Sequence, residues 1–140
     1  MKKRKKVIVA GSRGFSNYSL LEYTLDNILE KFENPIIISG HAKGADSLGE
    51  VYAWKHKLNC KVYKADWNKY GRKAGIIRNQ DMARIGDVLV AFWDGNSYGT
   101  LDMISLAIEY NLKIYVVDYI NKKFYIDEQI NDIFGDTIPF

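Results

Sequence analysis

Five short apolar runs rich in β-branched residues recur along the chain, and segments of helical periodicity separate each run from the next. The runs lie at residues 5–10, 36–38, 61–65, 87–93 and 113–119. Between them, apolar residues recur at spacings of three and four over residues 21–32, 45–55, 74–85 and 100–111, the pattern of a helix with one buried face. Strands that alternate with such helices predict βαβ units and a parallel sheet covered on both faces.

The order of these elements predicts an α/β fold, a Rossmann-like three-layer sandwich with right-handed crossovers. We expect a mostly parallel five-stranded sheet in the order 3-2-1-4-5, with the switch point between the first and fourth strands. Residues 124–126 are expected to add an antiparallel edge strand, residues 127–134 a short helix, and residues 66–73 a loop. The 140 residues predict a single domain over 1–140, with its core in 5–118 and a C-terminal extension in 121–140.

The composition is that of a globular protein, because 47% of the residues are hydrophobic and 26% are charged. No window reaches the roughly 18 uninterrupted apolar residues of a membrane span, and residues 7–10 are too short for the apolar region of a signal peptide. The single cysteine, Cys60, allows no intramolecular disulfide and fits a reducing compartment. These features predict a cytoplasmic protein without a membrane partner.

Small and polar residues gather where three of the predicted strands end. Ligands of open α/β sheets bind beyond the carboxyl ends of the strands, where glycines admit a close approach and helix N-termini attract anions. We therefore expect a phosphate site at this edge. The candidate residues are Gly11, Ser12 and Arg13 after the first strand, Ser39, Gly40, Lys43, Gly44 and Asp46 after the second, and Asp94, Gly95, Ser97, Gly99 and Thr100 after the fourth.

Three further candidates lie outside these loops. Arg78 offers a guanidinium fork to a phosphate, and Asn79 can read the edge of a base. Trp67 can stack on a base or pack against the edge of the sheet. The segments contain neither a Gly-Lys-Ser/Thr triplet nor a G-x-G-x-x-G pattern after the first strand, so a P-loop and ordinary nicotinamide hydride chemistry are not expected.

Metal-ligating residue types are sparse and isolated in this sequence. His41, His56 and Cys60 lack the spacing of a zinc site and form no nucleophilic constellation. We predict no metal site and no required cofactor. A magnesium ion that bridges a ligand phosphate to Asp94 is compatible with the sequence, but no residue pattern demands it.

Several of these blocks run in the order found in a known family. They are Gly11-Ser12-Arg13-Gly14-Phe15, the block from Ser39 to Asp46, Ala65-Asp66-Trp67, Gly71, Ala74-Gly75, Arg78-Asn79 with Met82, and Trp93-Asp94-Gly95 followed by Gly99-Thr100. Over about residues 5–118 the chain resembles the YspA/YpsA-related branch of the SLOG superfamily, whose members are bacterial and phage Rossmann-like domains. The resemblance implies binding of a nucleotide or a nucleotide-derived signal.

The same superfamily contains the lonely-guy phosphoribohydrolases, which cleave the glycosidic bond of nucleoside 5′-monophosphates. Arg78 with Met82 resembles one of their signatures, and Gly95 with Gly99-Thr100 resembles part of the other. The glutamate of that second signature falls on Met103 here, while Asp102 lies one position earlier. One residue rotates a helical side chain by about 100°, so Asp102 is either a catalytic carboxylate displaced on its helix or a first-turn acid that favours the helix dipole. Asp102 and Arg78 are the candidate catalytic residues.

The function expected from the sequence is therefore binding of a nucleotide-type small molecule such as ADP-ribose, NAD or a cyclic nucleotide, as a sensor or a sequestering protein. An N-glycosidase acting on nucleoside 5′-monophosphates is the first alternative, and single-stranded nucleic-acid binding is the second. The modest net charge of +3 and the expected absence of interleaved basic and aromatic residues make nucleic acid the least expected partner. The family resemblance also implies a homodimer or higher homo-oligomer.

Overall fold

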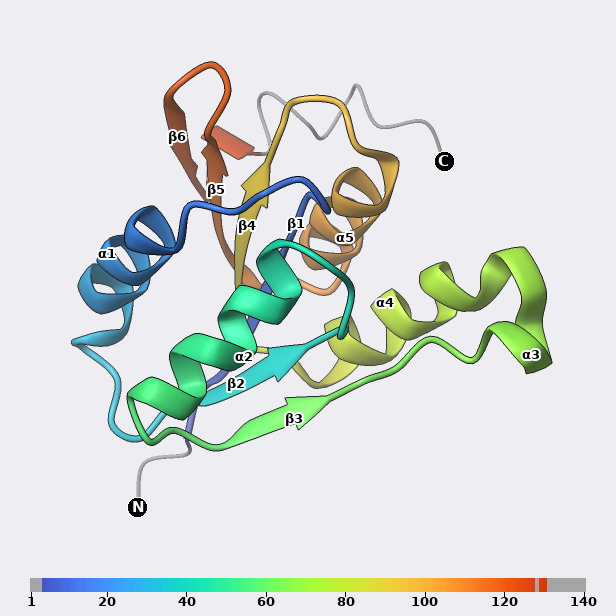
Figure 1. The fold of residues 1–140 in the computed structure, drawn as a ribbon, viewed down its shortest axis with the longest axis horizontal. Helices are drawn as coiled ribbons and strands as arrows, with labels where there is room; N and C mark the ends of the chain where they lie inside the picture. The colour runs from blue at the N-terminus through green and yellow to red at the C-terminus, as the bar shows by residue number, and fades with distance from the viewer. Residues whose placement is uncertain (1–3, 128, 131–140) are drawn as a thin grey trace.

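The computed structural model describes residues 4–127 and 129–130, and its centre is a six-stranded sheet in the order β3-β2-β1-β4-β5-β6 (Figure 1). The strands are β1 (Lys6–Gly11), β2 (Ile36–Ser39), β3 (Cys60–Val62), β4 (Val88–Trp93), β5 (Lys113–Asp118) and β6 (Lys123–Ile126). The first five strands are parallel, and β6 pairs antiparallel with β5. The predicted strand order and the antiparallel edge strand are both confirmed.

Helices cover both faces of this sheet, as the alternation of elements predicts. They are α1 (Tyr18–Leu29), α2 (Ala45–Lys55), α3 (Trp67–Tyr70), the 3-10 helix η1 (Gly71–Lys73), α4 (Ala74–Ile85) and α5 (Tyr98–Glu109). Apolar side chains of α1 and α2 share one core with one face of the sheet, and those of α4 and α5 share a second core with the other face. The molecule is the expected three-layer sandwich.

Successive residues of the central strands enter opposite cores, because side chains alternate along a strand. Val7 and Val9 of β1 belong to the core under α1 and α2, whereas Ile8 belongs to the core under α4 and α5. All three are fully buried. A strand that is buried on both faces has no polar position, which explains why these strands read as unbroken apolar runs in the sequence.

Two predicted segments differ from the structure between residues 60 and 73. The third strand was expected over 61–65 but spans only Cys60–Val62, because β2 offers it three pairing positions, ending at Ser39 opposite Val62. The expected loop at 66–73 instead forms α3 and η1. Asp66 explains this correction, since its carboxylate accepts the Lys69 N–H at 3.1 Å and caps α3.

Other boundaries moved by one to three residues, and the ends of the chain are described only in part. The first helix ends at Leu29, before Phe32, and the helix predicted over residues 100–111 begins at Tyr98, two residues early. Most of the short helix expected at residues 127–134 lies outside the described residues. Within the described ranges, no helix combines the length and the apolar character needed to cross a membrane.

Candidate functional site

A pocket of about 1070 Å³ opens at the carboxyl ends of β1 and β4 and extends between α4 and α5. This is the switch point of the sheet, where β1 pairs with β2 on one side and β4 on the other. Twelve of the candidates named from the sequence line it: Gly11, Ser12, Arg13, Asp46, Trp67, Arg78, Asn79, Asp94, Ser97, Gly99, Thr100 and Asp102. The structure therefore brings together residues that lie up to 91 positions apart in the chain.

The other five candidates lie outside the lining of the pocket: Ser39, Gly40, Lys43, Gly44 and Gly95. Two of them, Gly40 and Gly44, contact residues that line the pocket. The carbonyl of Gly40 accepts a hydrogen bond from Arg78. Gly44 adopts a φ of +82°, and a Cβ on it would lie 2.2 Å from the Ser12 carbonyl oxygen, so only glycine lets the loop after β2 close onto the loop after β1.

Ser39 is fully buried, and its hydroxyl has local partners instead of a ligand. It donates to the Glu50 carboxylate at 2.7 Å, and the same carboxylate oxygen lies 2.8 Å from Nδ1 of His41. The hydroxyl also accepts the backbone N–H of His41 at 3.1 Å. These bonds hold the start of the loop after β2 against α2.

Hydrogen bonds tie the loops after β1 and β4 to each other. The hydroxyl of Ser12 accepts the backbone N–H of Asp94 at 2.9 Å and lies 3.0 Å from the hydroxyl of Ser97. The Asp94 carboxylate accepts the N–H groups of Asn96 and Ser97 at 2.8 and 2.7 Å. Partial burial raises the pKa of Asp94, but these bonds outweigh it, and the pKa lies below its ordinary value. Asp94 thus shapes the loop as a carboxylate.

The N-terminus of α5 opens into this pocket without a side-chain cap. Ser97 occupies the N-cap position, but its hydroxyl donates to Thr100 Oγ1 at 3.2 Å and accepts no hydrogen bond from a backbone N–H of the helix. The first N–H groups of a helix have no partner within the helix, and the helix dipole adds positive charge there. A Cβ at Gly99 would meet no atom within 4 Å, so the space beside the first turn is open.

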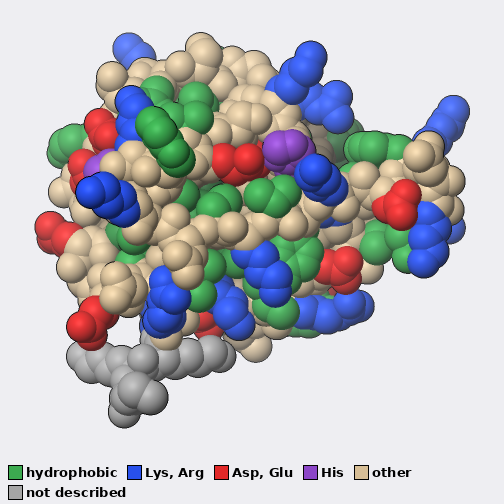
Figure 2. All heavy atoms as spheres, turned by 60° about the horizontal axis from the view of Figure 1, so that its bottom comes forward, with side chains coloured by type: hydrophobic (Ala, Val, Ile, Leu, Met, Phe, Trp, Pro, Cys, Tyr) green, Lys and Arg blue, Asp and Glu red, His purple; other side chains and the backbone are tan. Residues whose placement is uncertain are grey.

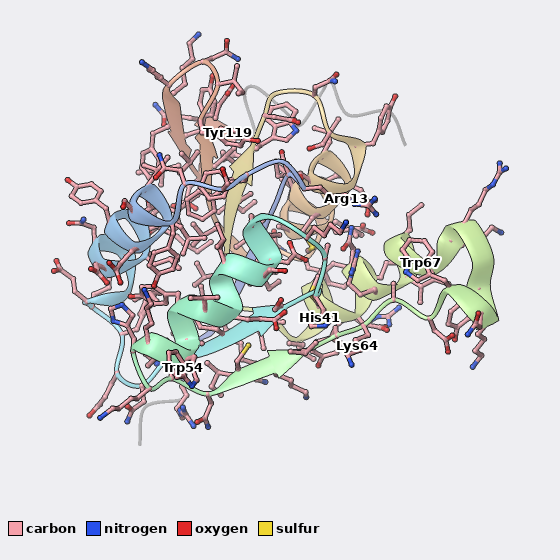
Figure 3. All side chains as sticks on the ribbon, viewed as in Figure 1. Arg13, His41, Trp54, Lys64, Trp67 and Tyr119 are labelled. Carbon is pink, nitrogen blue, oxygen red and sulfur yellow. The ribbon has the colours of Figure 1, made fainter. Side chains whose placement is uncertain are left out.

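Two arginines line the pocket near this helix end. Arg78 is half-buried, and it donates from Nη1 to the Gly40 carbonyl and from Nε to Asn79 Oδ1. Burial lowers the pKa of Arg78, the charge of Asp46 raises it, and the charge of Arg13 lowers it. Arg13 itself is exposed on the loop after β1 (Figure 3). The two guanidinium groups therefore place positive charge on one cavity.

Asp46 is the most deeply buried acid of the site, with 5% of its surface exposed. It lies in the first turn of α2, and its carboxylate accepts the Ala42 N–H at 3.3 Å. Burial raises its pKa to about 6, although the bonds from Ala42 and Gly11 and the charge of Arg78 act in the opposite direction. Asp46 should therefore change between its neutral and charged forms around pH 6.

Asp102 reaches the pocket despite its position one residue from the family glutamate. Its carboxylate accepts a hydrogen bond from Asn79 Nδ2 at 2.8 Å, and burial raises its pKa, while the Asn79 bond and the charge of Arg78 lower it. Asn79 is 6% exposed, and its amide also donates to the Gly99 carbonyl at 3.3 Å. Both ends of the Asn79 side chain are thus engaged within the protein rather than turned to a base.

Aromatic surface flanks the mouth of the pocket. Trp67, at the start of α3, is 53% exposed, and the edge of its indole lies near Gly75 beside the Arg78 guanidinium. Tyr98, at the start of α5, is 77% exposed and also lines the pocket. Trp67 therefore presents a ring to the pocket mouth instead of packing into the sheet edge.

Sequence reasoning missed the part of the pocket that runs between α4 and α5. Its lining there includes Ile76, Gln80, Leu101, Ser105, Ile108 and Glu109, and Arg72 of η1 also lines the pocket. The spacing of 101, 105 and 108 on one helix and of 76 and 80 on the other places each set on a single helix face. That periodicity was visible in the sequence, but it reads equally as a face packed into the core.

The described residues contain no cluster of side chains suited to a metal centre. In residues 4–127 and 129–130, no three His, Cys, Asp or Glu side chains are arranged to hold a metal ion. Asp94, the residue considered for magnesium, uses one carboxylate oxygen for two backbone N–H groups.

Comparison with known proteins places this architecture. Residues 5–70 match the family described as the YspA, cpYpsA-related SLOG family. The chain is 32% identical over 103 residues to the Gene 61 protein of Mycobacterium phage D29, an alignment that covers 69% of this chain and 82% of that protein.

The fold also resembles that of DNA processing protein A (DprA) from Streptococcus pneumoniae, with a TM-score of 0.65. The two sequences are 16% identical, and the match covers 92% of this chain but only 53% of the DprA chain, so it shows a shared fold alone. Taken with the family match and the phage relative, the observations establish that the chain belongs to the YspA, cpYpsA-related SLOG family.

Proposed function

We propose that this protein binds a nucleotide or a nucleotide-derived signal in the pocket at the switch point, as a sensor or a sequestering protein. One observation carries the proposal: Arg13 and Arg78 line the same cavity into which the uncapped first turn of α5 opens. Arginine forks and free helix N–H groups are the donors that proteins use to bind phosphate. A phosphate group of the ligand would lie beside Gly99, where the space is open.

The remaining lining residues support the rest of such a ligand. The Asp102 carboxylate can accept hydrogen bonds from ribose hydroxyls, and the exposed ring of Trp67 can stack on a base. A volume of about 1070 Å³ is at the upper end of small-molecule pockets, which accommodates a dinucleotide as well as a mononucleotide.

Thermal denaturation with a panel of ligands tests the proposal. AMP, ADP-ribose, NAD and cyclic AMP are compared with adenosine, which lacks the phosphate. A ligand at 100 times its Kd should stabilise the protein by about 2.7 kcal/mol. Adenosine should give no shift, and Arg13→Gln should reduce the shift given by the phosphorylated ligands. A panel without any stabilising phosphate ligand, or equal shifts with adenosine and AMP, would contradict the proposal.

A second candidate function is N-glycosidic hydrolysis, which the placement of Asp102 favours. The Asp102 carboxylate lies in the pocket and accepts a hydrogen bond from Asn79, and the charge of Arg78 lowers its pKa. In that reaction water and a nucleoside 5′-monophosphate give the free base and ribose 5-phosphate, and a carboxylate can activate the water or stabilise the developing charge on the ribose.

Chromatography of a long incubation with each of the common nucleoside monophosphates separates the two functions. An enzyme would release base in an amount that Asp102→Asn abolishes, while a binding protein would leave the nucleotide intact. Self-association, which the family resemblance implies, stays a prediction that sedimentation velocity can check.

A further inference from the structure

The positive charge of the chain is concentrated in one segment. Residues 54–73 hold seven of the 20 Lys and Arg residues and one of the 17 acidic residues. This segment therefore carries a formal charge of +6, whereas the rest of the chain carries −3. The modest total of +3 hides this separation, which is why net charge alone argues against a polyanionic partner.

The basic side chains of this segment are exposed and uncompensated. All three residues of β3 are exposed, and Lys57, Lys64 and Lys69 are exposed as well. Among the residues that the structure describes, none of the seven basic side chains lies within 4.0 Å of a carboxylate. Figure 2, which turns the lower side of Figure 1 toward the viewer, shows Lys and Arg side chains spread across that face, with some Asp and Glu side chains between them. The one acid, Asp66, caps α3.

Exposed aromatic rings alternate with these cations, so the expectation that the chain has no interleaved basic and aromatic residues is wrong for this segment. Trp54 is 80% exposed, Trp67 is 53% exposed and Tyr70 is 39% exposed, although rings of this size usually bury most of their surface. Figure 3 shows Trp54 at the C-terminal end of α2, and Lys64 and Trp67 farther along the side of the molecule formed by β3 and α3. We call the exposed side chains of residues 54–73 the basic-aromatic strip.

The strip leads from the outer edge of the sheet to the pocket. Trp67 and Arg72 belong to both, since they line the pocket and lie in the last third of the strip. An extended polyanion lying on the strip would therefore bring one end to the pocket mouth.

We propose that the basic-aromatic strip binds single-stranded nucleic acid. Cations along a groove or edge neutralise the phosphates, and exposed rings at intervals stack on bases, which is how sequence-tolerant single-strand binders work. The bases of a duplex are hidden from such rings. The cations and rings here are distributed over the last turn of α2, the edge strand β3, and the short helices α3 and η1 rather than along one face of a long amphipathic helix, which disfavours a membrane surface. This inference does not depend on the function proposed for the pocket.

Fluorescence anisotropy with a labelled 20-nucleotide oligothymidylate tests this inference. The logarithm of the association constant should fall linearly with the logarithm of the salt concentration. Lys61→Glu/Lys64→Glu should make this slope shallower and should lower the affinity about tenfold or more at 0.1 M salt. Lys122→Glu/Lys123→Glu carries the same charge change at the opposite edge of the sheet and should bind as the wild type does. Trp54→Ala, which removes a ring far from the pocket, should weaken binding at least about fivefold.

Four outcomes would overturn the inference. The first is no binding of the oligothymidylate at micromolar protein in 50 mM salt, and the second is an equal loss of affinity in the two double variants. The third is tighter binding to a duplex of the same length, and the fourth is preferential binding to phosphatidylserine vesicles. The Lys61→Glu/Lys64→Glu variant should keep the thermal shift given by nucleotides, because neither residue lines the pocket. The experiments therefore distinguish a wrong proposal for nucleic-acid binding by the strip from a wrong proposal for nucleotide binding in the pocket.

Discussion

The side-chain amide of Asn79 donates a hydrogen bond to the Asp102 carboxylate across 2.8 Å, and this bond joins α4 to α5 in the wall of the pocket. Asn79 Oδ1 also accepts from Arg78 Nε at 3.0 Å. The buried Asn79 amide therefore orients both candidate catalytic side chains, the carboxylate of Asp102 and the guanidinium of Arg78.

Removing this amide should destabilise the protein. Asn79→Ala leaves the half-buried Asp102 carboxylate and the Arg78 Nε–H without their partner, and the expected loss of unfolding free energy is about 1–3 kcal/mol. Urea denaturation measures this loss. Gln80→Ala, which also changes an amide side chain on α4 at the pocket but removes no hydrogen bond seen in the structure, is the control. An unchanged midpoint in Asn79→Ala would contradict the role assigned to the amide.

The two arginines should separate binding from stability. Arg13 is exposed, so Arg13→Ala should weaken phosphate-ligand binding and leave the unfolding free energy within about 0.5 kcal/mol of the wild type. Arg78→Ala should lower both the affinity for the phosphate ligand and the unfolding free energy, because the Arg78 guanidinium is half-buried and bonded to the Gly40 carbonyl. Calorimetric titration with the best ligand of the panel and urea denaturation give the two readouts. Loss of stability in Arg13→Ala would show that its placement is wrong.

Two glycines of the candidate site should respond oppositely to a methyl group. Gly44→Ala should cost more than about 1 kcal/mol of unfolding free energy, since φ is +82° and the Cβ would meet the Ser12 carbonyl oxygen at 2.2 Å. Gly99→Ala should keep or raise stability by up to about 1 kcal/mol, because it lies in α5 with open space around it. The same methyl group should weaken phosphate binding at the first turn of α5. Thermal denaturation with and without ligand measures both effects.

Asp46 should make stability depend on pH. Because burial raises its folded pKa to about 6, above the ordinary value of about 3.9, its protonated form favours the folded state fully below pH ~4, and this stability is lost as the pH rises through 6. Asp46→Asn cannot titrate, so its stability relative to the wild type should rise between pH 4 and pH 7, by up to about 3 kcal/mol. Denaturation curves at both pH values check this. A difference that is constant with pH would exclude the shift.

The alternation of apolar runs and helical segments was enough to predict the sheet order, the helix faces and the loops that border the pocket. These features depend on local periodicity and on chirality rules that act within each βαβ unit. The α3 turn was missed because a single side-chain cap, Asp66, decides it over four residues. The strip of residues 54–73 was visible in the sequence, but exposure of Trp54 and of both faces of β3 depends on where the sheet ends.

What only the tertiary structure decided is which loop residues share one cavity. Ser12 meets Ser97 from 85 positions away, and Asp46 of α2 lines the pocket while Ser39, the last residue of β2, bonds to Glu50 outside the pocket lining. Likewise, the sequence did not decide whether the Asp102 side chain points into the pocket, because Asp102 lies one position before the family glutamate. The packing of α4 against α5, which places Asn79 opposite Asp102, decides it. Such partnerships depend on how separate elements pack together, and a one-dimensional pattern carries the direction of a side chain only within its own helix or strand.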